Sequence, residues 1–151
     1  MDNLWICELV MVLIIPILVF FFGYHFDKKG APKEMNRLFG YRTTRSLQTW
    51  ETWTFAHAKL GKLWKLTGLI MIPVSAGLFA LTYNKGDDVT SVFGIIIMLV
   101  QVVALVVTVV FVEKSLKENF DERGERTEAS LEAEQKKAQE KAEKKEKSKK
   151  K

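Results

Sequence analysis

The strongest candidate for binding chemistry in this sequence is a pair of arginines three positions apart. Arg42 and Arg45 lie in the segment GYRTTRS, beside the hydroxyl groups of Thr43, Thr44 and Ser46. Guanidinium groups bind phosphate and carboxylate oxygens through paired hydrogen bonds, and neighbouring hydroxyls add further donors. The segment therefore predicts a site for a lipid headgroup or, in a more specific version, for the carboxylate of a peptide or protein.

Residues for catalysis or metal binding do not form a recognisable pattern. The two histidines, His25 and His57, have no carboxylate or cysteine partner at the spacing of a metal site. The sequence has no nucleophile motif or phosphate-binding glycine loop. Its single cysteine, Cys7, lies inside an apolar block, so neither an internal disulfide nor a cysteine cluster can form. We therefore expect a protein that is not an enzyme and that needs no metal or cofactor.

The chain that must position these residues has its apolar side chains sorted into three long blocks. A charged fraction of 27% would suit a soluble protein, but sorting of this kind differs from the dispersed periodicity of a globular chain. The blocks cover about residues 4–24, 66–83 and 92–112. At 1.5 Å per residue the first reaches roughly 30 Å and the second roughly 27 Å, close to the thickness of the hydrocarbon layer. The sequence predicts an all-α integral membrane protein with three transmembrane helices.

The charges between the blocks predict the orientation. Residues 25–65 are rich in Lys and Arg, and so is the C-terminal tail, whereas the connection NKGDDVTS has one Lys beside two Asp. By the positive-inside rule the long loop and the tail are cytoplasmic. We expect a multi-pass protein of the cell membrane with its N-terminus outside and its C-terminus in the cytoplasm.

Two polar side chains interrupt the apolar blocks. Glu8 lies one turn inside the first block, and Gln101 lies near the middle of the third. Polar groups at such depth usually face protein partners or a functional path, although Glu8 can also reach the outer interface. A small transporter or channel that depends on them is a weaker interpretation.

A helix inside the long loop is predicted from the spacing of its aromatic residues. Ser46 is a candidate N-cap for a helix that begins near Leu47. One face of this helix carries residues spaced by three and four: Trp50, Trp53, His57, Leu60 and Trp64. Such an aromatic stripe with basic flanks suits an amphipathic helix in the membrane interface, and it suits packing against the spans equally well.

The tail, residues 113–151, is predicted to be distinct from a membrane domain of residues 1–112. It consists mostly of Glu, Lys, Ala and Gln without a sustained heptad, which is typical of a solvated helix that frays or of a disordered end. Its final KKEKSKKK can touch anionic lipid or an acidic partner, or merely solubilise the chain. We attribute the net charge of +5 to topology and lipid contact rather than to nucleic-acid binding.

The segment of residues 30–65 resembles the hallmark loop of the SdpI family of small bacterial membrane proteins. That loop has an Asn, then GYRT, a basic residue and Ser, then a Glu-x-Trp helix with Phe-Ala. The matching residues here are Asn36, Gly40, Tyr41, Arg42, Thr43, Arg45, Ser46, Glu51, Trp53, Phe55, Ala56 and Gly61. The likeness extends over about residues 35–112. The chain departs from the pattern at Trp50, where an acidic residue is more usual, and at His57, where Asn is common.

The resemblance implies a membrane immunity protein that protects its producer from a secreted toxic peptide and signals by holding a transcriptional repressor at the membrane. Expected partners are therefore anionic headgroups, a peptide toxin, a cytoplasmic regulator, and further copies or subunits of a larger membrane complex. The alternative is an accessory or scaffold subunit whose charged tail docks a soluble partner. Candidate partner- or lipid-binding residues are Asn36, Gly40, Tyr41, Arg42, Thr43, Arg45, Ser46, Glu51 and Trp53.

Overall fold

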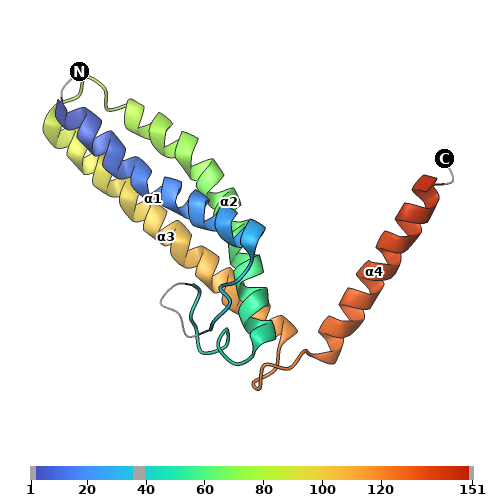
Figure 1. Cartoon of the computed structure of the whole chain (residues 1–151). Helices are drawn as coiled ribbons and strands as arrows, with labels where there is room; N and C mark the ends of the chain where they lie inside the picture. Colours follow the sequence, from blue (N-terminus) through green and yellow to red (C-terminus); the bar gives the residue numbers. More distant parts are fainter. Residues whose placement is uncertain (1–2, 36–39, 150–151) are drawn as a thin grey trace.

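The computed structural model describes residues 3–35 and 40–149, which are all-helical apart from one β-bridge between Phe120 and Arg126. The helices are α1 (Asn3–Lys29), α2 (Trp50–Ala80), α3 (Asp87–Asn119) and α4 (Glu128–Lys149). Figure 1 shows α1, α2 and α3 as an antiparallel bundle, with α4 projecting away from it. Residues 30–35 and 40–49 lie at one end, which we call the loop end. The N-terminus and the α2–α3 connection share the opposite end.

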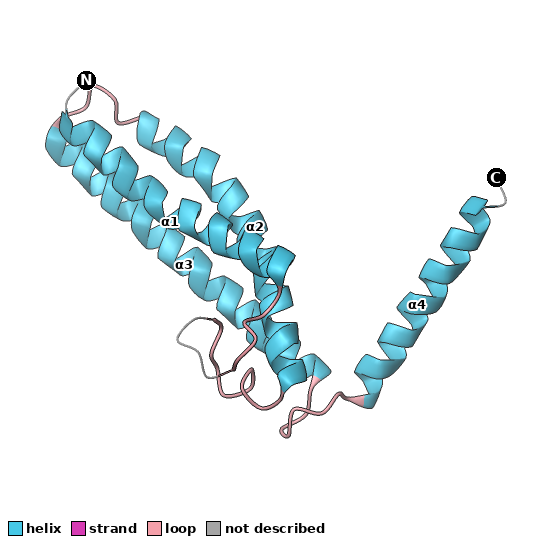
Figure 2. Ribbon diagram, in the orientation of Figure 1, coloured by secondary structure: helices cyan, strands magenta, loops and turns pink. Residues whose placement is uncertain are grey.

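The prediction of three membrane-spanning helices is confirmed. Within the described ranges, α1, α2 and α3 are each long and apolar enough to cross a bilayer. Most of their large apolar side chains point outward, as expected for helices surrounded by lipid. Each helix is longer than the apolar block that predicted it, and α2 and α3 extend beyond their blocks at the loop end (Figure 2).

The start of α2 differs from the prediction. Thr49 is the N-cap: its hydroxyl accepts from the Thr52 N–H at 3.2 Å, and the Thr52 hydroxyl accepts from the Thr49 N–H at 3.0 Å. This reciprocal pair satisfies two backbone donors that a helix start leaves free. The prediction that Ser46 caps a helix beginning near Leu47 was wrong, and α2 begins at Trp50.

The helix predicted within the loop is the first part of α2 rather than a separate helix lying along the membrane surface. Of its aromatic stripe, Trp53, His57 and Leu60 are buried, whereas Trp50 is exposed. Trp64 is half-buried and donates its indole N–H to the Thr108 hydroxyl of α3 at 2.9 Å. The stripe therefore packs against protein, which was the second of the two interpretations.

Glycines bring α1 and α2 into the most extensive interface of the bundle. A Cβ added at Gly68 would lie 2.5 Å from the Phe20 nitrogen, and one at Gly61 would lie 2.7 Å from the Asp27 nitrogen. Neither distance leaves room for a side chain. Small residues that let backbones approach are typical of helix pairs in membranes, where close packing replaces the hydrophobic drive to associate.

Both intramembrane polar side chains face other helices. The Gln101 amide donates to the Val12 carbonyl at 3.0 Å and to the Ser75 hydroxyl at 2.8 Å, so it joins all three spans. Pro16 explains why the Val12 carbonyl is free to accept a hydrogen bond from Gln101, because proline has no N–H to donate to the carbonyl four residues before it. Glu8 accepts a hydrogen bond from the Ser91 hydroxyl near the opposite end of the bundle.

Candidate functional site

The backbone at Gly40 and Tyr41 is fixed against α2 by a histidine. The Tyr41 N–H donates to His57 Nε2 at 2.9 Å, and His57 Nδ1 lies 2.8 Å from the Trp53 carbonyl. Gly40 has a φ of +127°, and a Cβ there would lie 2.5 Å from His57 Nε2. Glycine is therefore required at this position both by its backbone conformation and by the close approach of the ring.

These contacts define the protonation state of His57. A backbone N–H can only donate and a carbonyl can only accept, so Nε2 must be bare and Nδ1 must carry the proton. The ring is thus neutral and acts as a two-ended bridge from loop to helix. An asparagine amide also offers one acceptor and one donor, so it carries the same two hydrogen-bonding functions.

The Tyr41 side chain joins the loop to α3. Its hydroxyl donates to Glu113 Oε1 at 2.8 Å, and the ring is buried among apolar side chains of α2 and α3. Burial, and then the hydrogen bond to the Glu113 carboxylate, raise the pKa of Tyr41 well above its usual value of 10.0. The phenol therefore remains a donor throughout the physiological pH range.

The residues after Tyr41 form a tight hydrogen-bonded turn. The Ser46 hydroxyl accepts from the Thr43 N–H at 2.8 Å and lies 3.0 Å from the Tyr41 carbonyl, to which it can donate. The Thr43 hydroxyl accepts from the Ser46 N–H at 3.2 Å. Nearby, the indole N–H of Trp53 donates to the Pro32 carbonyl at 3.0 Å. Five predicted site residues thus come together as a scaffold: Gly40, Tyr41, Thr43, Ser46 and Trp53.

The two arginines that were predicted to act as a pair do not line the same cavity. Arg42 lines an open cavity of about 1050 Å³ beside the end of α1, whereas Arg45 is not among the described residues that line it. The cavity instead gathers Arg42 with Lys29 and Lys33. The sequence interpretation did not single out these two lysines. The spacing of His25 and Lys29, four residues apart and therefore on one face of α1, was the available signal.

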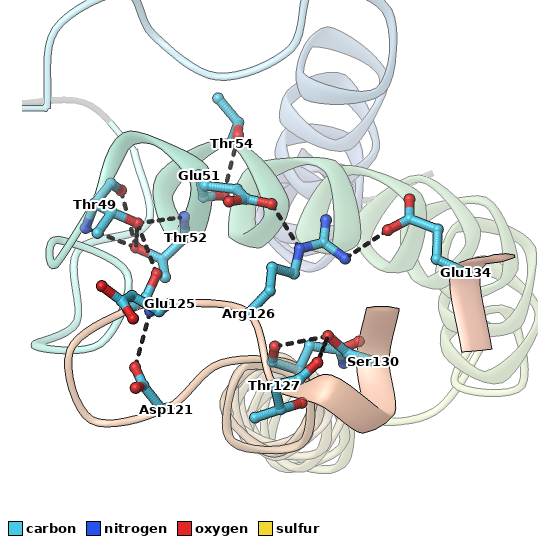
Figure 3. A network of polar contacts seen from close by, with 12 residues as sticks. Thr49, Glu51, Thr52, Thr54, Asp121, Glu125, Arg126, Thr127, Ser130 and Glu134 are labelled. Carbon is cyan, nitrogen blue, oxygen red and sulfur yellow. Dashed lines mark hydrogen bonds and ion pairs between the residues drawn. The ribbon is translucent and has the colours of Figure 1, made fainter. Parts of the chain in front are cut away.

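Glu51 is part of a contact between α2 and the start of the tail. Arg126 donates to Glu51 Oε1 at 2.6 Å and to Glu134 Oε2 at 2.9 Å, so one guanidinium joins α2 to α4 (Figure 3). The same group lies 5.1 Å from the ring centre of Phe120 and 5.8 Å from that of Phe55. The sequence did not predict this Arg126 contact, because its partners are far apart in the chain. Asn36, the remaining predicted site residue, lies outside the described residues.

Within the described ranges, no group of three or more His, Cys, Asp or Glu side chains is arranged to hold a metal ion. What the geometry does provide is a rigid loop attached to α2 and α3, a cationic cavity beside α1, and a charged helix attached through Arg126. These features belong to a multi-pass membrane protein with three helices long and apolar enough to span a bilayer.

Comparison with known proteins identifies the family. The family described as the SdpI/YfhL protein family matches residues 33–112, which is more than half of the chain. The match begins just after α1 and covers the loop, α2 and most of α3. The chain therefore belongs to the SdpI/YfhL family, as the loop motif indicated. No curated protein and no solved structure matches it.

Proposed function

We propose that this chain protects a bacterial cell against a membrane-active peptide and reports the presence of that peptide to a regulator in the cytoplasm. Its spans would meet the peptide within the bilayer, and the loop and tail would hold the regulator. Family membership and the implied role of the family's namesake support this proposal. We also propose that the loop end and α4 are cytoplasmic and the N-terminus external, since the positive charges concentrate at the loop end.

The observation that carries the proposal is that side-chain contacts at the loop end connect α2, α3 and α4. His57 joins the loop to α2, Tyr41 joins it to α3, and Arg126 joins α2 to α4. A change in how the spans pack would therefore alter the attachment of the tail. Such a route is what a sensor needs when its ligand lies in the membrane and its readout lies outside it.

The test of protection is survival of a sensitive bacterium that expresses the chain and is challenged with membrane-active peptides from its own source or close neighbours. We expect the wild type to protect and His57→Leu, which breaks the bridge to the loop, to lose protection while still reaching the membrane. Gly77→Ala is the matched control on α2, because a Cβ there meets nothing within 4 Å. No protection by a correctly inserted wild type would contradict the proposal.

Reporting is tested separately from protection. We expect Arg126→Gln to keep protection but to lose retention of a soluble regulator at the membrane, measured by fractionation of cells that co-express a candidate repressor with this chain. Arg123→Gln, in the same turn, is the control with an equal loss of charge. Equal retention in both variants would remove the proposed role of the Arg126 contact.

An accessory or scaffold subunit is the second candidate. The observation in its favour is α4, a charged helix that projects from the bundle and offers a docking surface for a soluble protein (Figure 1). Deletion of residues 128–151 separates the two functions. A scaffold loses its partner and its whole activity, whereas an immunity protein keeps the protection that its spans provide.

A further inference from the structure

The cavity beside the end of α1 has one apolar side. Phe21, Phe22 and Phe26 of α1 line it together with Trp64 of α2. Phe21 is 60% exposed on the outer surface of the bundle, so this side of the cavity meets the surface that α1 turns toward lipid. The apolar side is therefore the side of the cavity that the acyl chain of a bilayer lipid would meet.

The other side of the cavity is cationic. Lys29, Lys33 and Arg42 line it, with His25 beside them and one carboxylate, Glu34. Lys29 lies in the last turn of α1, and the other two cations lie on the loop that follows. Three cationic side chains gathered in one cavity attract phosphate groups, and Arg42 can pair with two phosphate oxygens at once.

The boundary between these two sides coincides with the predicted edge of the membrane. The first apolar block ends at about residue 24, after Phe21 and Phe22 and before Lys29. A phospholipid changes from chain to headgroup over the same boundary. A soluble phosphate would contact only the cationic side of the cavity. A peptide arriving from water would have to reach the exposed Phe21 at the lipid-facing surface, where a lipid of the bilayer is already present.

We propose that this cavity binds one anionic phospholipid, with its phosphate between Lys29, Lys33 and Arg42 and an acyl chain along Phe21 and Phe22. This site is separate from the proposed immunity function and does not depend on it. The scaffold of Tyr41 and His57 gives the site a fixed shape, because it fixes the loop that carries Arg42. The anionic headgroup that we expect the loop to bind would therefore occupy this cavity.

The experiment is native mass spectrometry of the full chain in detergent, titrated with phosphatidylglycerol or with phosphatidylcholine. We expect a single phosphatidylglycerol to remain bound at collision energies that strip phosphatidylcholine. The Lys33→Gln/Arg42→Gln variant should lower phosphatidylglycerol retention at least tenfold. Arg45→Gln/Lys59→Gln removes the same charge from residues that do not line the cavity and should retain the lipid as the wild type does.

Three results would overturn the proposal. Equal retention of the two lipids would show that the headgroup charge is not recognised. Equal loss in both double variants would show general charge attraction rather than this cavity. Displacement of the lipid by soluble glycerol phosphate or by a carboxylate-ended apolar peptide, at the concentration at which the lipid itself binds, would assign the site to another ligand. Circular dichroism of each variant confirms that the helices are intact.

Discussion

The hydroxyl of Tyr41 donates to the carboxylate of Glu113, 72 positions further along the chain, at 2.8 Å. This bond connects the loop of the SdpI motif to the third span in a region where the ring of Tyr41 is buried. A half-buried carboxylate that loses such a donor has to be satisfied by water or left unpaired. The tyrosine of the GYRT segment therefore has a structural partner within the chain and needs no ligand to satisfy its hydroxyl.

Replacement of Tyr41 by Phe tests this connection. We expect Tyr41→Phe to lower the free energy of unfolding by about 1–3 kcal/mol, because Glu113 then loses a charge-assisted hydrogen bond in a partly buried site. The measurement is SDS titration of the protein in mixed micelles, followed by tryptophan fluorescence. The double variant Tyr41→Phe/Glu113→Leu should lose less than the sum of the two single losses. If the loss in the double variant equals the sum of the two single losses, the hydrogen bond between Tyr41 and Glu113 does not contribute to stability.

Sequence patterns predicted the spans and the position of the motif, because apolar blocks and aromatic spacing are local properties. The inward direction of Gln101 was also predictable, since an amide within lipid needs partners. The particular partner was harder to foresee. It required Pro16 to deprive the Val12 carbonyl of its donor, and it required the first and third spans to align at that depth.

The contacts made by the motif were not predictable, because they depend on distant parts of the chain. Glu51 looked like a motif residue available for a partner, and the structure places it against Arg126 of the tail. Arg42 and Arg45 looked like a pair from their spacing, but the turn made by Thr43 and Ser46 allows only Arg42 to line the cavity. A loop without regular periodicity gives the sequence no information on where each side chain points.

Glycine spacing between α1 and α2 gives a second prediction. Gly68→Ala should destabilise the bundle by about 1–3 kcal/mol, because its Cβ would lie 2.5 Å from the Phe20 nitrogen and the helices would have to separate. Gly77→Ala, nine residues further along α2, should be neutral or stabilising by up to about 1 kcal/mol, since nothing lies near its Cβ. The measurement is the free energy of unfolding of both variants, obtained by SDS titration. Equal effects would contradict the close packing.

The connection of Gln101 to Val12 gives a third prediction. Gln101→Leu should lower the free energy of unfolding by about 1–2 kcal/mol, since it removes hydrogen bonds to the Val12 carbonyl and to Ser75. Pro16→Ala restores an N–H that can donate to Val12. The double variant Pro16→Ala/Gln101→Leu should therefore recover part of the loss, as measured by the same titration. If the double variant loses as much unfolding free energy as the two single variants together, Gln101 does not satisfy the Val12 carbonyl.

Arg126 should control where α4 lies without controlling whether the protein folds. Its ion pairs with Glu51 and Glu134 are partly exposed, and such pairs are worth about 0–1 kcal/mol each in solvent. We therefore expect Arg126→Gln to change the free energy of unfolding by less than about 1 kcal/mol while releasing α4 from α2. The measurement is the spin–spin distance between labels at positions 59 and 140, in a Cys7→Ser background that leaves no other thiol.

The distance distribution should broaden in Arg126→Gln and stay narrow in Arg123→Gln, whose side chain is exposed in the same turn. The backbone of that turn does not depend on either guanidinium. Asp121 accepts from the Arg123 and Glu125 N–H groups at 2.8 Å each, and these bonds are the main reason why the pKa of Asp121 lies below its usual value. Both arginine variants therefore keep the turn, so a broader distribution in Arg126→Gln alone assigns the attachment of α4 to the side chain of Arg126. Identical distributions would mean that other contacts hold α4.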